Sequence, residues 1–371
     1  MKKFLTTVKD GTRDYMFGEC AKIREISTNL CSFVKSRGYA EIMTPTFEYA
    51  DIFNISNEDL FKFTDGRNRL MALRADCTTP IARVAATKLC DNPAPYRLFY
   101  CQSVFNASRK KLEQSDFGVE LIGADGIRAD VEVLTLASGA LQKYFGVGCR
   151  IEIGHSKIYK LLCKEYSIDE DTAEKIRLLI EAKNFAAIES LDIPAAIKAL
   201  PKMFGGIEVL AEFKSLANNE KITEILSYLE SLYKILSSLG FSVSFDLGLV
   251  RRLDYYTGIV FEGYVDSHGV SILAGGRYDN LISEYGRDLK AIGFSACVDE
   301  IFDALDGDLR KITTPDVMIY FPDECFQKAY ALASTLTQSG KTVVFSTEAD
   351  ANSAREQAEK KGIAEFIEVT K

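Results

Sequence analysis

The sequence contains no tryptophan and only two histidines among its 371 residues. No stretch approaches the roughly 18 uncharged apolar residues of a membrane span, and the first residues include no apolar run of signal-peptide length. These absences predict a cytoplasmic protein with no membrane segment. With 47% hydrophobic and 26% charged residues, the chain has room for about two globular domains.

Cysteines are present, but their arrangement indicates neither disulfides nor a metal. There are nine, an odd number, and none belongs to a Cys-x-x-Cys pair. Two histidines add little to a zinc site. We therefore expect the cysteines to be small buried apolar groups in a reducing compartment, with no metal and no cofactor.

The chain also lacks the positive surplus that is usual in proteins that bind a polyanion. Its formal net charge is −8. This balance counts against nucleic-acid binding, although an acidic protein can still carry a local basic patch.

Hydrophobic periodicity predicts strands and helices in alternation before residue 156. Apolar residues at three- and four-residue steps predict a helix over 18–37, with Gly38 as its stop. Two further helices are expected over about 79–89 and between the strands at 117–122 and 150–153. Other early strands are expected over 39–43, 70–74 and 96–100.

From about residue 156 to 240 the pattern changes to nearly pure helix, which predicts a helical insert. Strands return over 241–245, 258–264, 270–274 and 292–296. Residues 1–310 are therefore predicted to form an α+β domain with one helical excursion. Residues 311–371 alternate three short strands with two helices, which predicts a small α/β tail that is too small to be very stable alone.

The segment 249–262 concentrates polar residues where a buried strand would carry apolar ones. It reads Leu-Val-Arg-Arg-Leu-Asp-Tyr-Tyr-Thr-Gly-Ile-Val-Phe-Glu. Burying Arg251, Arg252 and Asp254 without partners is costly, so a bound polar group is one interpretation. A surface loop between two strands is the other.

Three more segments carry polar residues at strand ends. Gly275 and Gly276 allow either a close backbone approach or a plain turn, and they match no phosphate-binding loop. Asp76 and Thr78 precede a helix, where ordinary N-caps explain them equally well. Glu120 interrupts an apolar strand, so it faces either solvent or a specific cation.

Taken together, these four segments resemble histidyl-tRNA synthetases in their order and approximate separation. The family's segments are similar to Leu-Arg-x-x-x-Thr, Phe-Gly-Val-Glu, Arg-Gly-Leu-Asp-Tyr-Tyr-Thr-Gly and Ala-Gly-Gly-Arg-Tyr-Asp. Residues 11–14, 38–48 and 292–294 fit the same family, so the resemblance covers about residues 8–305. It implies a class II aminoacyl-tRNA synthetase-like antiparallel sheet flanked by helices, with residues 311–371 as a reduced anticodon-binding-like domain.

The positions that the resemblance assigns to ATP binding are altered. Asn106 and Glu300 stand where the family has arginines that bind ATP. Replacing such an arginine with a carboxylate reverses a charge-assisted contact worth roughly 1.5–3 kcal/mol. Residues 313–371 also carry six Lys and Arg against nine Asp and Glu. We therefore expect no catalytic activity of the chain's own and no tRNA binding.

The amino-acid pocket, by contrast, is largely kept. The residues that the resemblance implies for histidine binding are Asp76, Thr78, Asp116, Glu120, Arg251, Tyr255, Tyr256 and Tyr278. In this scheme Glu120 pairs with the ammonium, Arg251 lies near the carboxylate, and the tyrosines wall the imidazole. Asp116 replaces the family's usual glutamine, so we expect an altered ligand geometry and a low affinity.

A fold that keeps a histidine-like pocket and loses ATP chemistry resembles the regulatory subunits of short-form ATP phosphoribosyltransferases. Residues 73–83, 118–123 and 182–188 are similar to that subfamily. The resemblance implies a hetero-oligomer with a short catalytic subunit, which joins ATP to phosphoribosyl pyrophosphate in the first step of L-histidine biosynthesis. L-Histidine would be the feedback effector. The Thr44-Pro45 segment resembles the family's dimer motif, so self-association as a dimer is expected.

Two other functions stay open at this stage. One is a divergent histidyl-tRNA synthetase that activates histidine with ATP. The other is a synthetase-like amino-acid sensor with a different partner.

Overall fold

The computed structural model describes residues 6–53, 59–250, 256–305 and 314–370. The chain divides into two compact units. The larger comprises residues 1–14 and 22–306, and the smaller comprises residues 15–21 and 307–371. Within the described ranges, no helix combines the length and the apolar character that crossing a bilayer requires.

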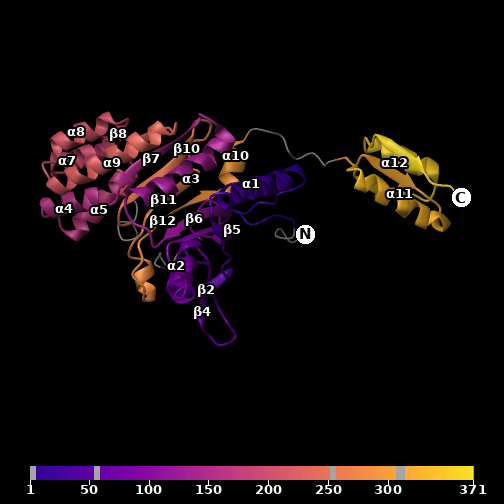
Figure 1. The fold of residues 1–371 in the computed structure, drawn as a ribbon, viewed down its shortest axis with the longest axis horizontal. Helices are drawn as coiled ribbons and strands as arrows, with labels where there is room; N and C mark the ends of the chain where they lie inside the picture. Colours follow the sequence, from indigo (N-terminus) through magenta and orange to yellow (C-terminus); the bar gives the residue numbers. More distant parts are fainter. Residues whose placement is uncertain (1–5, 54–58, 251–255, 306–313, 371) are drawn as a thin grey trace. The chain divides into compact units, whose positions relative to one another are not determined.

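A nine-stranded sheet forms the core of the larger unit (Figure 1). Its strands are β1 (Ala40–Glu41), β5 (Tyr96–Phe105), β6 (Glu113–Ile122), β7 (Cys149–His155), β8 (Phe204–Gly205), β9 (Val243–Asp246), β10 (Ile259–Val265), β11 (Leu273–Arg277) and β12 (Ala291–Cys297). They lie in the order β1-β5-β6-β12-β11-β10-β7-β9-β8. The run from β5 to β7 is antiparallel throughout. The predicted antiparallel sheet is therefore confirmed at its centre, while β1 and β9 add parallel pairings that make the whole sheet mixed.

One face of this sheet is covered by α1 (Gly18–Lys35) and α3 (Ile127–Phe145). Side chains alternate along β5, so Arg97 and Phe99 point to this side. Arg97 donates to Glu132 of α3 at 2.7 Å, and Lys35 of α1 lies 5.4 Å from the centre of the Phe99 ring. Helix α3 packs its apolar stripe on β6, β7, β10 and β12.

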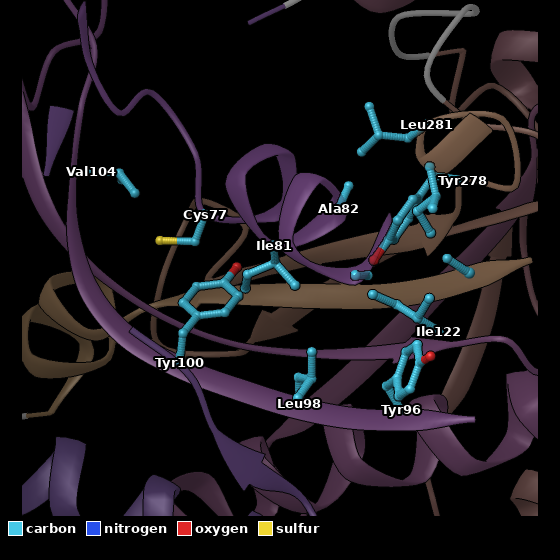
Figure 2. Close-up of a cluster of buried hydrophobic side chains, with 13 residues drawn as sticks. Cys77, Ile81, Ala82, Tyr96, Leu98, Tyr100, Val104, Ile122, Tyr278 and Leu281 are labelled. Atoms are coloured by element: carbon cyan, nitrogen blue, oxygen red, sulfur yellow. The ribbon is translucent and has the colours of Figure 1, made fainter. Parts of the chain in front are cut away.

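The other face of β5 is packed against α2 (Thr78–Thr87). Tyr96, Leu98 and Tyr100 form a buried cluster with Ile81 of that helix (Figure 2). Figure 2 also places Tyr278 in this cluster, immediately after the end of β11. Burial of this apolar surface, at about 25 cal/mol per Å², fixes α2 on the sheet.

Six helices form the predicted insert: α4 (Lys157–Glu165), α5 (Glu170–Glu181), α6 (Phe185–Ser190), α7 (Ala195–Ala199), α8 (Glu208–Leu216) and α9 (Glu220–Ser238). Three of them begin at polar residues whose side chains accept a backbone N–H of the first turn, namely Asp169, Asn184 and Asn219. Such caps satisfy amides that have no partner inside the helix. The short strand β8 interrupts the insert and pairs with β9.

A buried charge pair joins the insert to the sheet. Asp130 of α3 is only 2% exposed and accepts a hydrogen bond from Arg277 Nε, at the end of β11, at 3.0 Å. Its other carboxylate oxygen accepts from the Tyr228 hydroxyl of α9 at 2.6 Å. Helix α3, helix α9 and strand β11 therefore meet at one carboxylate.

A second, three-stranded sheet precedes α2, with β2 (Phe47–Tyr49), β4 (Leu70–Leu73) and β3 (Lys62–Thr64) in that order. All its pairings are antiparallel. One side covers a small core that includes Phe53, Leu60 and Ala72. Only β4 was expected from the sequence, and its two partners were missed.

The smaller unit contains a three-stranded parallel sheet, β14-β13-β15. Its elements are β13 (Val317–Tyr320), α11 (Phe326–Gln338), β14 (Val343–Phe345), α12 (Ala351–Lys360) and β15 (Glu365–Glu368). Val317 and Ile319 pack toward α11, whereas Met318 packs toward α12. The period-two alternation of β13 thus places a helix on each face, which confirms the predicted α/β tail.

Removal of the Asp130 carboxylate tests the junction between insert and sheet. In Asp130→Ala, Arg277 stays buried without its main counter-charge, so we expect the free energy of unfolding to fall by about 3–5 kcal/mol in urea denaturation. Asp125→Ala removes a 68%-exposed partner of the same arginine and should cost under about 1 kcal/mol. Equal losses in the two variants would contradict this account.

Candidate functional site

Six of the eight residues predicted to bind histidine lie in the described part of the chain: Asp76, Thr78, Asp116, Glu120, Tyr256 and Tyr278. Strand β6, the start of α2 and the segments next to β10 and β11 supply them. The other two, Arg251 and Tyr255, lie outside the described residues.

Glu120 is the most deeply buried carboxylate of this group, at 1% exposure. One oxygen accepts from the Thr78 hydroxyl at 2.6 Å, and the other accepts from the Tyr278 hydroxyl. Gly293 lies opposite on β12, where a Cβ would overlap the carboxylate. Burial raises the pKa of Glu120 to about 8, although the two hydroxyls oppose this shift. The structure therefore brings Glu120, Thr78 and Tyr278 into one hydrogen-bonded cluster.

Asp76 serves the start of α2. Its carboxylate accepts the Thr79 backbone N–H at 2.7 Å and the Thr79 hydroxyl at 3.1 Å. The helix-capping interpretation is thus confirmed for Asp76, but not for Thr78, whose hydroxyl donates to Glu120. Burial nevertheless raises the pKa of Asp76, and the residue also lines the main cavity described below. Capping does not prevent this carboxylate from facing a ligand.

Asp116 lies four residues before Glu120, on the same face of β6. It is 7% exposed, and Gln114 Nε2 donates to it at 2.7 Å. Burial raises the pKa of Asp116 to about 7, the hydrogen bond and Arg109 oppose the shift, and the charge of Asp299 adds to it. The site therefore holds a carboxyl group that titrates near neutral pH.

A cavity of about 720 Å³ opens beside these residues. Its acidic lining residues are Asp76, Asp116, Glu300 and Asp303, and its basic lining residues are Arg109, Lys110 and Lys111, together with His268. Glu120 and Tyr278 lie outside this lining. The cavity is thus acidic on the α2 and β6 side and mixed in charge on the side of the loop that joins β5 to β6.

The ring of Tyr256 packs closely against Gly276 of β11. A Cβ on Gly276 would lie 2.7 Å from the Tyr256 ring, which is too close for any side chain. The close-approach interpretation of this glycine is therefore confirmed. Tyr256 also packs against the α2 cluster that contains Tyr278.

Asn106, one of the two positions predicted to have lost an ATP-binding arginine, stabilises a turn. Its side-chain oxygen accepts the backbone N–H of Ser108 at 2.9 Å and that of Arg109 at 3.0 Å. Asparagine suits this role because its short side chain can bond the backbone two residues on. Asn106 thereby shapes the loop that follows β5.

Glu300, the other altered position, lies in α10 (Val298–Ala304) and is not an isolated negative charge. It pairs with Lys111 Nζ at 2.6 Å and with His268 Nε2 at 2.7 Å. Burial opposes ionisation of Glu300, but these two partners outweigh it and lower its pKa. Lys111 also pairs with Asp303 at 2.8 Å, and Asp303 pairs with Arg13 at 3.0 Å.

This end of the cavity nevertheless carries positive charge. The arginines are absent from positions 106 and 300, but the loop supplies Arg109, Lys110 and Lys111. Sequence reasoning missed this run, although three consecutive basic residues between two strands were a visible signal. Lys111 is held by carboxylates, whereas the charge of Arg109 acts on Asp76 and Asp116.

Among the described residues, no group of three His, Cys, Asp or Glu side chains is placed to hold a metal ion. Of the six described residues predicted to bind histidine, Asp76 and Asp116 line the cavity, whereas Thr78, Glu120, Tyr256 and Tyr278 lie outside its lining. Two carboxylates on one wall suit a ligand that carries a positive charge.

Comparisons with known proteins agree with this architecture. Residues 11–301 match the family model described as Histidyl-tRNA synthetase. The chain is also similar to a crystal structure described as an ATP phosphoribosyltransferase regulatory subunit/histidyl-tRNA synthetase from Bacillus halodurans. The TM-score is 0.86 at 31% identity, over 99% of each chain. The fold is accordingly that of the class II synthetase-like proteins.

Sequence relatives narrow this class. The chain is 36% identical to the ATP phosphoribosyltransferase regulatory subunit of Clostridium kluyveri, over 98% of each chain. It is 34% identical to that of Bacillus cereus, over 99% of this chain and 93% of the relative. The chain belongs to the family of ATP phosphoribosyltransferase regulatory subunits, which share their fold with histidyl-tRNA synthetases.

The raised pKa of Asp116 makes stability depend on pH. The folded pKa of about 7 lies above the ordinary value of 3.8, so the folded state binds this proton more tightly than the unfolded state does. The free energy of unfolding should therefore fall as the pH rises from about 4 to about 7. Asp116→Asn removes this contribution and should flatten the profile, raising stability at pH 8 by on the order of 1 kcal/mol or more.

Urea denaturation at pH 5, 6, 7 and 8 measures this effect. Glu120→Gln is the matched comparison, since it should flatten the profile up to about pH 8, where the Glu120 pKa lies. A profile for Asp116→Asn that runs parallel to the wild-type profile would refute the assignment.

Proposed function

We propose that the chain is the non-catalytic regulatory subunit of a short-form ATP phosphoribosyltransferase, in which a partner subunit performs the glycosyl transfer. It holds that partner in an active arrangement, and L-histidine binding biases the assembly toward an inhibited one. The observation that carries this proposal is the cavity with buried carboxylates on one wall, in a chain of the regulatory-subunit family. The setting is the first step of histidine biosynthesis in the cytoplasm.

The pocket suits the cationic groups of histidine. Asp76 and Asp116 line the cavity, so we place them nearest the ligand ammonium. Both oxygens of Glu120 already accept hydroxyl donors and the residue lies outside the cavity lining, so we place Glu120 behind the pocket wall. Tyr256 and Tyr278 remain the proposed flat faces for the imidazole, although neither lines the cavity. Arg109 offers a positive charge for the carboxylate from within the described cavity, in addition to the proposed role of Arg251.

Inhibition requires histidine to bind one state of the assembly more tightly than the other. A coupling free energy of roughly 1–3 kcal/mol changes the relative affinity by about 5- to 150-fold. Asp116 contributes to this coupling. Burial raises its pKa and so favours the neutral carboxyl in the empty pocket, whereas a bound ammonium favours the charged carboxylate.

The direct test is a phosphoribosyltransferase assay of a short catalytic subunit with and without this chain, titrated with histidine. Activity should depend on the chain and should fall as histidine is added. In Asp76→Asn and Glu120→Gln, the histidine concentration for half-inhibition should rise about tenfold or more, because each variant removes a carboxyl group that a bound ammonium would stabilise in its charged form. Asparagine keeps the cap at the start of α2, so Asp76→Asn should remain folded.

Asp288→Asn is the control, since this carboxylate is 80% exposed and does not line the cavity. Calorimetry on the same variants measures histidine affinity without the partner. Unchanged affinity in both pocket variants would remove the pocket assignment. Activity of the catalytic subunit that ignores this chain would remove the regulatory assignment.

One observation, the basic loop between β5 and β6, favours the alternative function of a histidyl-tRNA synthetase. Arg109, Lys110 and Lys111 line the cavity next to the amino-acid residues, where a phosphate would need cations. Lys111 is already paired with Glu300 and Asp303, which opposes that role. Histidine-dependent exchange of pyrophosphate into ATP by the pure protein would establish the alternative and overturn the non-catalytic assignment.

We further propose that two copies of the chain associate through the exposed side of the β2-β4-β3 sheet. Phe47 is 54% exposed, Phe63 is 41% exposed and Leu70 is 47% exposed, and the two phenylalanine rings lie 5.9 Å apart. Contiguous apolar surface of this kind on a sheet favours a protein partner. The Thr44-Pro45 segment, which resembles the family's dimer motif, directly precedes β2.

Sedimentation of Phe47→Asp tests this interface. The variant should shift toward monomer at micromolar concentration, because a dimer would bury the new charge without a partner. Val147→Asp alters an isolated apolar side chain that is 98% exposed, so it should sediment like the wild type. A Phe47→Asp protein that stays as large as the wild type would contradict the proposed interface.

A further inference from the structure

The N-terminal segment 9–14 lies against the loop of residues 106–112, which joins β5 to β6. The Gly11 carbonyl oxygen accepts the Leu112 backbone N–H at 2.8 Å. Leu112 also closes the loop, because its own carbonyl oxygen accepts the Asn106 backbone N–H at 2.9 Å. The segment is therefore hydrogen-bonded to the last residue of the loop, directly before β6 begins.

This contact leaves no room for a side chain at position 11. Gly11 has a φ of +85°, in the left-handed region that favours glycine. A Cβ at this position would lie 2.6 Å from Leu112 Cγ and 2.9 Å from the Lys110 carbonyl oxygen. A backbone carbonyl cannot swing aside as a flexible side chain does, so any larger residue here has to move the segment away from the loop.

Arg13 attaches the same segment to α10. Its guanidinium pairs with Asp303 at 3.0 Å and lies 5.4 Å from the centre of the Phe302 ring. Solvent screens this partly exposed ion pair, and the aromatic contact adds to the attachment. Lys111 of the loop pairs with the same Asp303 at 2.8 Å and with Glu300 at 2.6 Å. Segment, loop and α10 thus each contact the other two.

Arg109 is the residue of this loop whose charge acts on the carboxylates of the cavity. It lines the same cavity as Asp76 and Asp116. Burial raises the pKa of both carboxyl groups, and the charge of Arg109 opposes that shift. The Arg109 backbone N–H donates to Asn106 Oδ1 at 3.0 Å, so the turn of the loop determines where this side chain begins. No residue of the segment 9–14 is among those that line the cavity.

We propose that Gly11 and Arg13 are positioning residues for the ligand cavity, because they hold the loop that places Arg109 beside the cavity's carboxylates. Both act from outside the cavity, through the loop and α10. Residues 11–14 fit the synthetase-like family in sequence, but no role in the pocket followed from that resemblance, and this contact gives them one. The inference concerns the charge of the cavity itself, so it holds for any ligand and does not depend on histidine.

Carbon-13 NMR titration of the Asp116 carboxyl group in the full-length protein, without any ligand, tests the proposal. Asp116→Asn identifies the resonance. Arg109→Gln should raise the pKa of Asp116 by roughly 0.5 or more, since burial then acts without the opposing charge. Gly11→Ala changes no charge but displaces the segment, so it should also raise this pKa. In a protein that already carries Arg109→Gln, it should have no further effect.

Arg13→Gln is the second test, and Arg69→Gln is its matched control. Arg69 combines the same two contacts as Arg13, since it pairs with Asp65 at 2.6 Å and lies 5.2 Å from the centre of the Tyr49 ring. It does not line the cavity. Arg13→Gln should therefore raise the pKa of Asp116, whereas Arg69→Gln should leave it at the wild-type value.

A wild-type pKa of Asp116 in both Gly11→Ala and Arg13→Gln would overturn the proposal. An increase that persists undiminished when either change is combined with Arg109→Gln would overturn it as well, because the segment would then not act through Arg109. Arg13→Gln alone and in that combination decides the question if Gly11→Ala fails to fold.

Discussion

The proposed ligand site depends on three carboxylates, the buried Asp116 and Glu120 on β6 and the partly buried Asp76 before α2. Removing a carboxylate from water is costly unless hydrogen bonds or a counter-charge compensate. The fold supplies hydroxyls for Glu120, backbone and hydroxyl donors for Asp76, and one amide for Asp116. These neutral donors leave the pKa of all three groups raised. We therefore propose that a positively charged ligand supplies the compensation that these neutral donors do not give.

Glycines on two strands make room for the side chains around the site. Glu120 can lie flat on the sheet only because β12 has Gly293 opposite it, and Tyr256 can lie on β11 only because of Gly276. Helix α2 closes the region from above, with its apolar side on β5 and its polar start at Asp76 and Thr78. The apolar side of this short helix thus packs on the sheet, while Thr78 at its start bonds Glu120 and Asp76 lines the cavity.

Much of the fold could be predicted from the sequence, because long elements repeat their apolar pattern several times. Helix α1, the insert and the α/β tail were all expected near their observed positions. Strands β2 and β3 were missed because three residues are too few to show a period of two. Strands β5 and β6 are longer than expected. The ends that were missed carry polar residues, namely Gln102, Ser103 and residues 113–116, so they lack an apolar pattern although their backbone pairing continues.

The site was only partly predictable. The resemblance to a family located the carboxylates and the tyrosines, whose positions are set by local motifs. It did not show that Glu300 pairs with Lys111 and His268, because those partners are distant in sequence and no spacing rule connects them. Taken alone, Glu300 indicated only repulsion of phosphate. In the structure the same residue holds the basic loop against α10.

The carboxylate of Asp130 connects the helical insert to the end of strand β11. Tyr228 on α9 and Arg277 at the end of β11 both donate hydrogen bonds to it, and the residue after Arg277 is Tyr278. A displacement of α9 against the sheet would therefore pull on the backbone beside the hydroxyl that holds Glu120. We therefore propose that a movement of α9 changes the surroundings of Glu120 through Asp130, Arg277 and Tyr278.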